Sequence, residues 1–104
     1  TVTYGGQTHP ADGNAGMVVT NRKRAQELAR GGPEIAILGL GQARVQPAYM
    51  PAAPVPAAKR ALQQAGLGIE QIDAVTSHNP FAVNDLIFAR ETGFALDRMN
   101  ARGC

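Results

Sequence analysis

His78 is the residue of this chain whose type and position are best suited to chemistry. It directly follows an apolar segment, residues 72–77, and precedes a helix that opens at Pro80-Phe81. Ligand-binding and catalytic groups of open α/β sheets gather at such carboxyl ends of strands, close to helix N-termini. An imidazole there can donate a hydrogen bond to a carbonyl oxygen or orient a water molecule. A histidine that caps the helix or satisfies a loop carbonyl fits the same position, and the residues alone leave both interpretations open.

A glycine-rich stretch, Gly39-Leu40-Gly41-Gln42-Ala43-Arg44, nearly matches a dinucleotide-binding fingerprint. Arg44 replaces the third glycine, and Val45-Gln46-Pro47 follows instead of a helix whose N-terminus could receive a pyrophosphate. We therefore expect these glycines to let a strand bend or approach a neighbouring element closely. The lone Cys104 and the loop residue His9 have no surrounding residues that indicate catalysis, and no metal site is expected.

The composition limits the function classes that the 104 residues can serve. Ten basic and eight acidic residues leave a formal charge of +2, with no basic stretch beyond Arg22-Lys23-Arg24, so no nucleic-acid partner is expected. No apolar run approaches the roughly 18 residues of a membrane span. We therefore expect a cytoplasmic protein with no membrane partner. Because the chain starts in strand-like residues without a methionine and stops at a loop, we also expect an internal piece of a longer protein.

Strand-like and helical segments alternate along the chain. Short apolar runs predict strands over residues 15–20, 34–46 and 74–77. Helical spacing predicts helices over residues 22–30, 56–65 and 81–92. Asn21 can cap the first helix, and Gly31-Gly32-Pro33, Gly66 and Gly93 can end the three helices in turn. This order predicts an α/β fold in which helices cross over between the strands of a parallel or mixed sheet.

Four segments resemble, in order and with matching spacing, the sequence motifs of thiolases. They are Val2–Gly16, similar to VTAGNASGxNDGAAA; Met50–Ala57, similar to MGxGPIPA; Thr76–Ala82, similar to EANEAFA; and Met99–Cys104, similar to the VNVNGG that leads into the GHP motif. Lys59–Ile72 resembles the helix and connector that follow the second motif. The resemblance runs over essentially the whole chain and identifies it as a fragment of a thiolase-like protein.

The resemblance implies the thiolase fold, two similar βαβαβαββ halves packed in five layers of helices and sheets. Residues 1–32 would complete the N-terminal half and residues 33–104 would start the C-terminal half, joined at Gly31-Gly32-Pro33. It also implies acyl transfer between coenzyme A and acyl-CoA through a cysteine thioester, in a parent enzyme that forms a homodimer or tetramer. Coenzyme A and acyl-CoA are substrates there, and no covalently bound cofactor is expected. The family's nucleophilic cysteine lies upstream of Thr1, and its GHP histidine and second cysteine lie beyond Cys104, so we expect the fragment alone to be inactive.

The resemblance also assigns roles to single residues. His78 falls on the asparagine of NEAF, which helps to build an oxyanion site through a bound water, and a histidine there is similar to the sterol-carrier-protein-type branch. Phe81 matches a phenylalanine that lines the pantetheine tunnel, and Gln7 and Thr8 match an Ala-Ser pair whose hydroxyl contacts pantetheine. Further tunnel positions fall on Tyr4 and Met50. Two other functions stay open: a thiolase-like protein that binds acyl-CoA or lipid without turnover, and a free-standing interaction domain.

Overall fold

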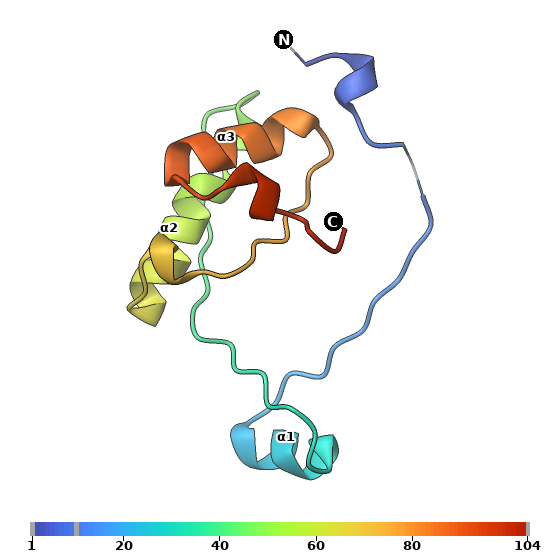
Figure 1. The fold of residues 1–104 in the computed structure, drawn as a ribbon, viewed down its shortest axis with the longest axis vertical. Helices are drawn as coiled ribbons and strands as arrows, with labels where there is room; N and C mark the ends of the chain where they lie inside the picture. Colours follow the sequence, from blue (N-terminus) through green and yellow to red (C-terminus); the bar gives the residue numbers. More distant parts are fainter. Residues whose placement is uncertain (1, 10, 104) are drawn as a thin grey trace.

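The computed structural model of the chain describes residues 2–9 and 11–103. Within these residues it contains three α-helices, α1 (Arg22–Ala29), α2 (Pro54–Ala65) and α3 (Ala82–Thr92). Short 3-10 helices cover Tyr4–Gly6, Met50–Ala52, Ile69–Gln71 and Leu96–Arg98. Helices α2 and α3 pack against each other, whereas α1 lies at the far end of two long extended segments (Figure 1). None of the described helices is both long and apolar enough to cross a membrane.

The structure confirms the three helices predicted from the sequence, and local signals set several of their ends. The C-cap of helix α1 is Arg30, which itself adopts a left-handed φ of 48°, one residue before the expected Gly31-Gly32-Pro33. The Asn21 side-chain oxygen accepts a hydrogen bond from the Arg24 backbone N–H over 3.0 Å and so caps α1. Gly66 and Gly93 follow α2 and α3 with φ of 69° and 78°, left-handed values that glycine adopts without strain. Helix α2 begins at Pro54, earlier than predicted, because prolines are well tolerated in a first turn that needs no intrahelical N–H donor.

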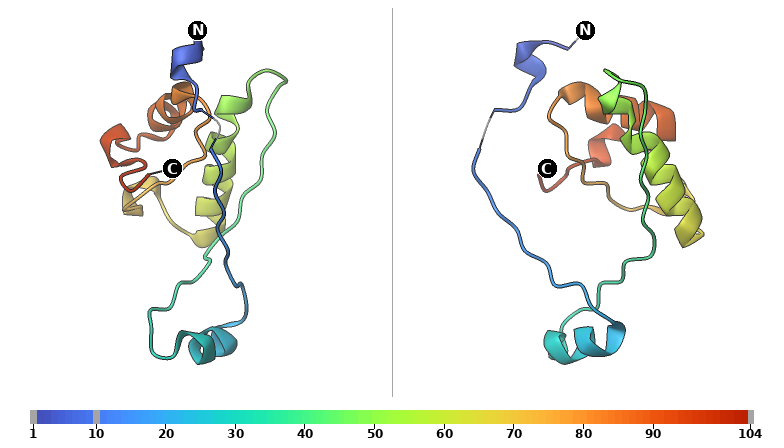
Figure 2. Two further views of the ribbon diagram at one scale, coloured as in Figure 1. Left: turned by 90° about the vertical axis from the view of Figure 1, so that its right-hand side faces the viewer. Right: turned by 180° about the vertical axis from the view of Figure 1, so that it is seen from behind.

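The predicted strands differ from the structure. Residues 15–20 and 34–46 form no strand among the described residues; they run extended on either side of α1 and separate from each other (Figures 1 and 2). Residues 74–77 supply one isolated bridge, in which Val75 pairs in parallel with Met99. A strand is completed only by a second backbone about 4.8 Å away, and the apolar runs do not encode which segment that is. Periodicity therefore located extended segments but not their pairing.

The hydrophobic core lies where α2, α3 and the C-terminal turns meet. Its buried members are Val55, Phe88, Phe94 and Met99. Partly buried aliphatic residues surround them, among them Ala58, Ile69, Ile72, Val75, Ile87 and Ala89. Burial of these side chains is the main stabilising term available to the helical part of the chain, at roughly 25 cal/mol for each Å² of apolar surface removed from water.

The extended segment that contains Gly39 and Gly41 lies directly on α2. A Cβ atom at Gly39 would overlap the Ala61 carbonyl oxygen, and one at Gly41 would lie 2.8 Å from the Ala61 backbone nitrogen. The segment is also hydrogen-bonded to the helix, since the Leu40 N–H donates to Gln64 Oε1 over 2.7 Å and the Arg60 guanidinium donates to the Gln42 carbonyl oxygen. These contacts confirm that the two glycines serve a close approach of backbones.

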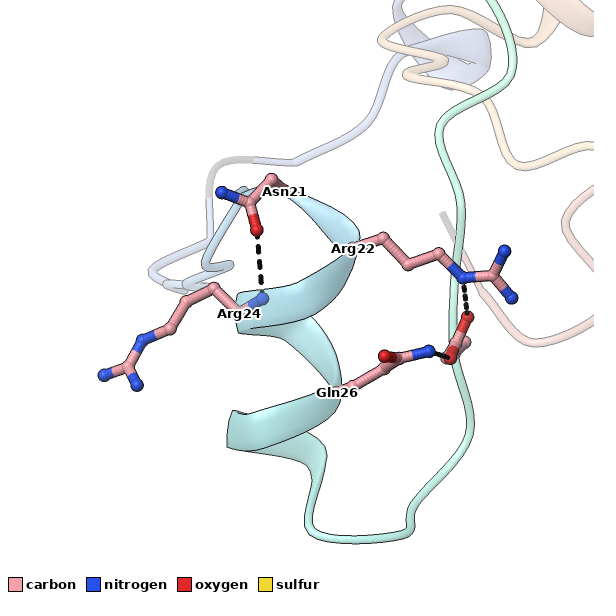
Figure 3. A network of polar contacts seen from close by, with 5 residues as sticks. Asn21, Arg22, Arg24 and Gln26 are labelled. Atoms are coloured by element: carbon pink, nitrogen blue, oxygen red, sulfur yellow. Dashed lines mark hydrogen bonds and ion pairs between the residues drawn. The ribbon is translucent and has the colours of Figure 1, made fainter.

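Helix α1 and the segment that follows it are held together by polar contacts rather than by a hydrophobic core. Glu34 accepts hydrogen bonds from Arg22 Nε, over 3.0 Å, and from the Gln26 side-chain amide (Figure 3). Every described residue of α1 is at least partly exposed, and the Arg22 side chain is 81% exposed. Exposed ion pairs of this kind contribute at most about 1 kcal/mol, so α1 is held mainly by its own backbone hydrogen bonds.

Candidate functional site

The loop that carries His78 is held by a carboxylate. Asp85, in the first turns of α3, accepts hydrogen bonds from Ser77 Oγ and from Asn79 Nδ2, each over 2.6 Å. Ser77 and Asn79 are half-buried, whereas His78 between them is exposed. The chain is therefore anchored through the side chains of both neighbours of an imidazole that stays accessible.

Asn100 joins the same polar cluster from the C-terminal turn. Its Nδ2 donates to Asp85 Oδ2 over 2.9 Å and to Ser77 Oγ over 3.0 Å, and its Oδ1 accepts from the Ser77 backbone N–H over 2.8 Å. The Asn100 backbone N–H donates to the Val75 carbonyl oxygen over 2.8 Å. Asn100 adopts a φ of 52°, a left-handed conformation in which asparagine is more common than most other residues. Ser77, Asn79, Asp85 and Asn100, which we call the Asp85 cluster, thus bring three chain segments together.

The N-terminal segment also contacts the loop that carries His78. The Thr8 backbone N–H donates to the Pro80 carbonyl oxygen over 3.0 Å, and its hydroxyl lies 3.5 Å from the same atom. Gln7 pairs with Phe81 in an antiparallel bridge. The structure therefore brings three of the predicted tunnel residues, Gln7, Thr8 and Phe81, beside the His78 loop.

None of the described hydrogen bonds joins the other two predicted tunnel residues, Tyr4 and Met50, to the loop. Tyr4 belongs to the same N-terminal segment, because its carbonyl oxygen accepts the Gln7 N–H over 3.1 Å. Tyr4 is 80% exposed, and its ring meets the His9 imidazole edge-on, with 6.1 Å between the centroids. Met50 begins the 3-10 helix Met50–Ala52, which packs against α3, and its side chain is also exposed. None of the described hydrogen bonds links Met50 to His78.

The helix-capping interpretation of His78 finds no support in the geometry. The N-cap position of α3 is Phe81, and the imidazole makes no hydrogen bond to the residues that the structure describes. The alternative interpretation, in which the imidazole satisfies a loop carbonyl, also finds no support, because no such hydrogen bond is present within residues 2–9 and 11–103. The exposed ring is free to meet a ligand atom. Cys104, for which the sequence gives no sign of catalysis, lies outside the described residues.

Two surface grooves are formed by α2 and lie away from this loop. The larger, of about 810 Å³, runs between residues 41–44 and the first half of α2, and the smaller, of about 310 Å³, lies beside its second half. No predicted site residue lines either groove. Within the part of the chain that the structure describes, no three His, Cys, Asp or Glu residues are grouped to hold a metal ion.

Sequence reasoning missed Asp85 and Asn100. No local signal marks either residue, because Asp85 follows another polar residue, Asn84, and Asn100 lies in a polar C-terminal stretch. The two residues are 15 positions apart along the chain and meet only in the fold. A further polar group is unexplained: Asn84 is buried and its Oδ1 has no hydrogen-bond partner among the described residues.

Comparisons with known proteins agree with this architecture. The acetyl-CoA acetyltransferase of Pseudomonas aeruginosa is 36% identical over 103 residues, which cover 98% of this chain and 26% of that protein. The 3-ketoacyl-CoA thiolase of Colwellia psychrerythraea is 35% identical over 105 residues, covering 99% of this chain and 27% of that protein. The chain thus spans about a quarter of the length of these curated relatives.

The fold is also found in a solved structure. The crystal structure of human mitochondrial 3-ketoacyl-CoA thiolase matches 78% of this chain and 21% of its own, with a TM-score of 0.67 and 28% sequence identity. This match confirms the predicted thiolase-like fold fragment. A family model described as "Thiolase, C-terminal domain" matches residues 32–104. Because this family model matches most of its length, the chain belongs to the thiolase family.

Proposed function

We propose that the chain is part of a thiolase-type acyltransferase, which moves an acyl group between coenzyme A and an acyl-CoA. The observation that carries the proposal is the attachment of Gln7 and Thr8 to the Pro80-Phe81 backbone, next to the exposed His78. The N-terminal segment and the start of α3 thereby contribute to one place. The names of the relatives, acetyl-CoA acetyltransferase and 3-ketoacyl-CoA thiolase, support the same class of reaction.

We assign the pantetheine arm of coenzyme A to the surface formed by Tyr4, Gln7, Thr8, Met50 and Phe81. Such an arm needs apolar walls with a few hydrogen-bonding groups, and these side chains supply both. The parent enzyme is a homodimer or tetramer in this proposal, with residues 1–32 closing its N-terminal half and residues 33–104 opening its C-terminal half. The start of the family match at residue 32 supports that division. The cytoplasmic location stays a prediction.

His78 has the role of a hydrogen-bond donor in this proposal. Negative charge develops on the thioester oxygen as a nucleophile attacks its carbonyl carbon, and a donor held in place stabilises that charge, directly or through a water. The anchored side chains on both sides of His78 support this role, since a preorganised donor need not be reoriented during the reaction. The histidine at this position favours the sterol-carrier-protein-type branch of the family.

The test compares turnover and acyl-CoA affinity of His78 variants in the full-length parent enzyme. Loss of one such donor typically lowers the rate by about 10² to 10³, so His78→Ala should reduce turnover at least about tenfold with a smaller change in binding. His78→Asn should recover part of the loss, because an amide can still hold a water. His9→Ala, at the other histidine of the chain, is the matched control and should keep full turnover.

Two results would count against this function. A His78→Ala enzyme with normal turnover removes His78 from the oxyanion site. A wild-type parent that binds acyl-CoA without any acyl exchange points instead to the alternative, a thiolase-like protein that binds acyl-CoA or lipid without catalysis.

A further inference from the structure

We propose that Asp85 is a positioning residue that acts through His78; the proposal rests on the role of His78 proposed above. Asp85 does not face the reacting atoms in this proposal. It holds the loop from which the imidazole reaches them.

The bonding pattern around Asp85 is that of an anchor for this loop. One carboxylate oxygen accepts from Ser77 Oγ over 2.6 Å, and the other accepts from Asn79 Nδ2 over 2.6 Å and from Asn100 Nδ2 over 2.9 Å. All three partners donate, which suits an ionised carboxylate because it only accepts. Hydrogen bonds to an ionised group are shorter and stronger than neutral ones. Asp85 also lies in the first turns of α3, where the helix dipole favours negative charge.

The position of His78 depends on these bonds because the imidazole has none of its own within the described residues. Its two sequence neighbours are both bonded to Asp85, and the Ser77 N–H is held in addition by Asn100. A misplacement of about 1 Å at a reacting group can cost about a hundredfold in rate. Loosening the anchor should therefore lower turnover while the acyl-CoA contacts of the tunnel residues persist.

Asp85→Asn is the sharpest variant, since it keeps the side-chain shape and replaces one accepting oxygen by a donating NH₂ group. That group would either face the donors of Asn79 and Asn100, and lose those bonds, or donate to the Ser77 hydroxyl instead of accepting from it. In both orientations the negative charge that strengthens the three hydrogen bonds is lost. We expect turnover to fall by about 10- to 100-fold, with the acyl-CoA dissociation constant within about twofold of wild type. Asp85→Glu keeps the carboxylate and should restore part of the turnover. Asp97→Asn, at an exposed aspartate, is the matched control and should have no effect.

Coupling to His78 distinguishes positioning from a merely structural role. If Asp85 acts through His78, Asp85→Asn should cause little further loss of turnover in a His78→Ala background, because residues that act as a unit are not additive. A structural role predicts the same fractional loss in both backgrounds, and that result would overturn the proposal, as would normal turnover of Asp85→Asn alone. Hydrogen exchange of the segment 75–79 should also rise in Asp85→Asn, and unchanged exchange contradicts the anchor.

The outcomes separate this proposal from the one on which it rests. If His78→Ala itself keeps full turnover, the proposed function of His78 fails whatever Asp85 does. If His78→Ala is impaired and Asp85→Asn is not, only the positioning role fails. Should Asp85→Asn not fold, Asn79→Ala removes a single donor from the cluster instead. Little further loss of turnover from Asn79→Ala in the His78→Ala background supports the positioning role, and the same fractional loss in both backgrounds contradicts it.

Discussion

The backbone N–H of Thr8 donates a hydrogen bond to the carbonyl oxygen of Pro80 over 3.0 Å, although 72 residues separate the two along the chain. The adjacent residues, Gln7 and Phe81, continue the contact as an antiparallel bridge. Closing so long a loop costs chain entropy, and two backbone pairs offset only part of it. A contact that joins the N-terminal segment to the start of α3 beside His78 therefore matters more for the site than for the stability of the helical core.

Phe81 offers the most direct test of the proposed tunnel. Phe81→Ala in the parent enzyme keeps the backbone bridge to Gln7 but removes a half-buried aromatic ring. We expect the acyl-CoA dissociation constant to rise at least about tenfold, which corresponds to about 1.4 kcal/mol of binding free energy. Leu86→Ala, an exposed position in α3, the helix that Phe81 precedes, is the control and should leave binding unchanged. Equal affinities of Phe81→Ala and wild type, measured by calorimetry, would exclude Phe81 from the tunnel.

The helices could be predicted from the sequence because their signals are local. Asn21 caps α1 through a bond to Arg24, three residues away, and Gly66 and Gly93 end α2 and α3 through their own backbone conformation. The strands were not predictable in the same way, since a hydrogen-bonded pair of strands depends on a second segment, and no local sequence pattern indicates which segment that is. Apolar runs such as residues 15–20 predicted extended chain correctly and sheet pairing not at all.

The candidate site was predictable only in part, for a related reason. The location of His78, between an apolar segment and a helix start, is a local feature and drew attention to it. The Asp85 cluster depends on side chains that meet across 6 to 23 residues of chain, and no spacing rule connects them. The arrival of Thr8 at Pro80 is equally non-local. The sequence therefore indicated the residue with chemistry, and the structure was needed to find what holds it.

Gly41 should tolerate no side chain, because its α-carbon faces the backbone of α2. A Cβ there would overlap the Ala57 carbonyl oxygen and lie 2.8 Å from the Ala61 nitrogen, both atoms that cannot turn aside as a flexible side chain can. We expect Gly41→Ala to lower the free energy of unfolding of the parent by about 1–3 kcal/mol. Gly13→Ala, where no heavy atom lies within 4 Å, is the matched control and should be near neutral. Urea denaturation midpoints that coincide for the two variants would show that the segment does not lie on α2.

Asn100 separates the effect of backbone conformation from that of its side-chain hydrogen bonds. Both Asn100→Gly and Asn100→Ala lose the bonds to Ser77 and Asp85, but only alanine places a Cβ in the left-handed region at a φ of 52°. We expect Asn100→Ala to be less stable than Asn100→Gly by about 1 kcal/mol. Ala48→Gly, at a φ of 69°, measures the backbone effect alone and should raise stability by a similar amount. Thermal denaturation in which the alanine variant is the more stable of the two at position 100 contradicts this reading of the turn.

The two extended segments beside α1 expose apolar side chains that their sequence marks for burial. The exposed residues are Met17, Val18, Val19, Ile35, Ile37, Leu38 and Leu40. Exposed apolar side chains of this number favour association in water, and an extended backbone without a strand partner adds free hydrogen-bonding groups. We therefore expect the isolated 104-residue chain to self-associate, with a sedimentation coefficient that rises with protein concentration.

A charge placed on this surface should weaken that association. Val18 is 78% exposed, so Val18→Lys disturbs no packing in the described chain and interrupts the apolar run at its centre. Gln46→Lys adds the same charge at an exposed position outside the run, and it should leave the association unchanged. If Val18→Lys and Gln46→Lys weaken the self-association equally, net charge rather than the exposed apolar side chains controls it. A wild-type chain that sediments as a monomer at every concentration, and melts in one sharp transition, would show that these segments need no partner.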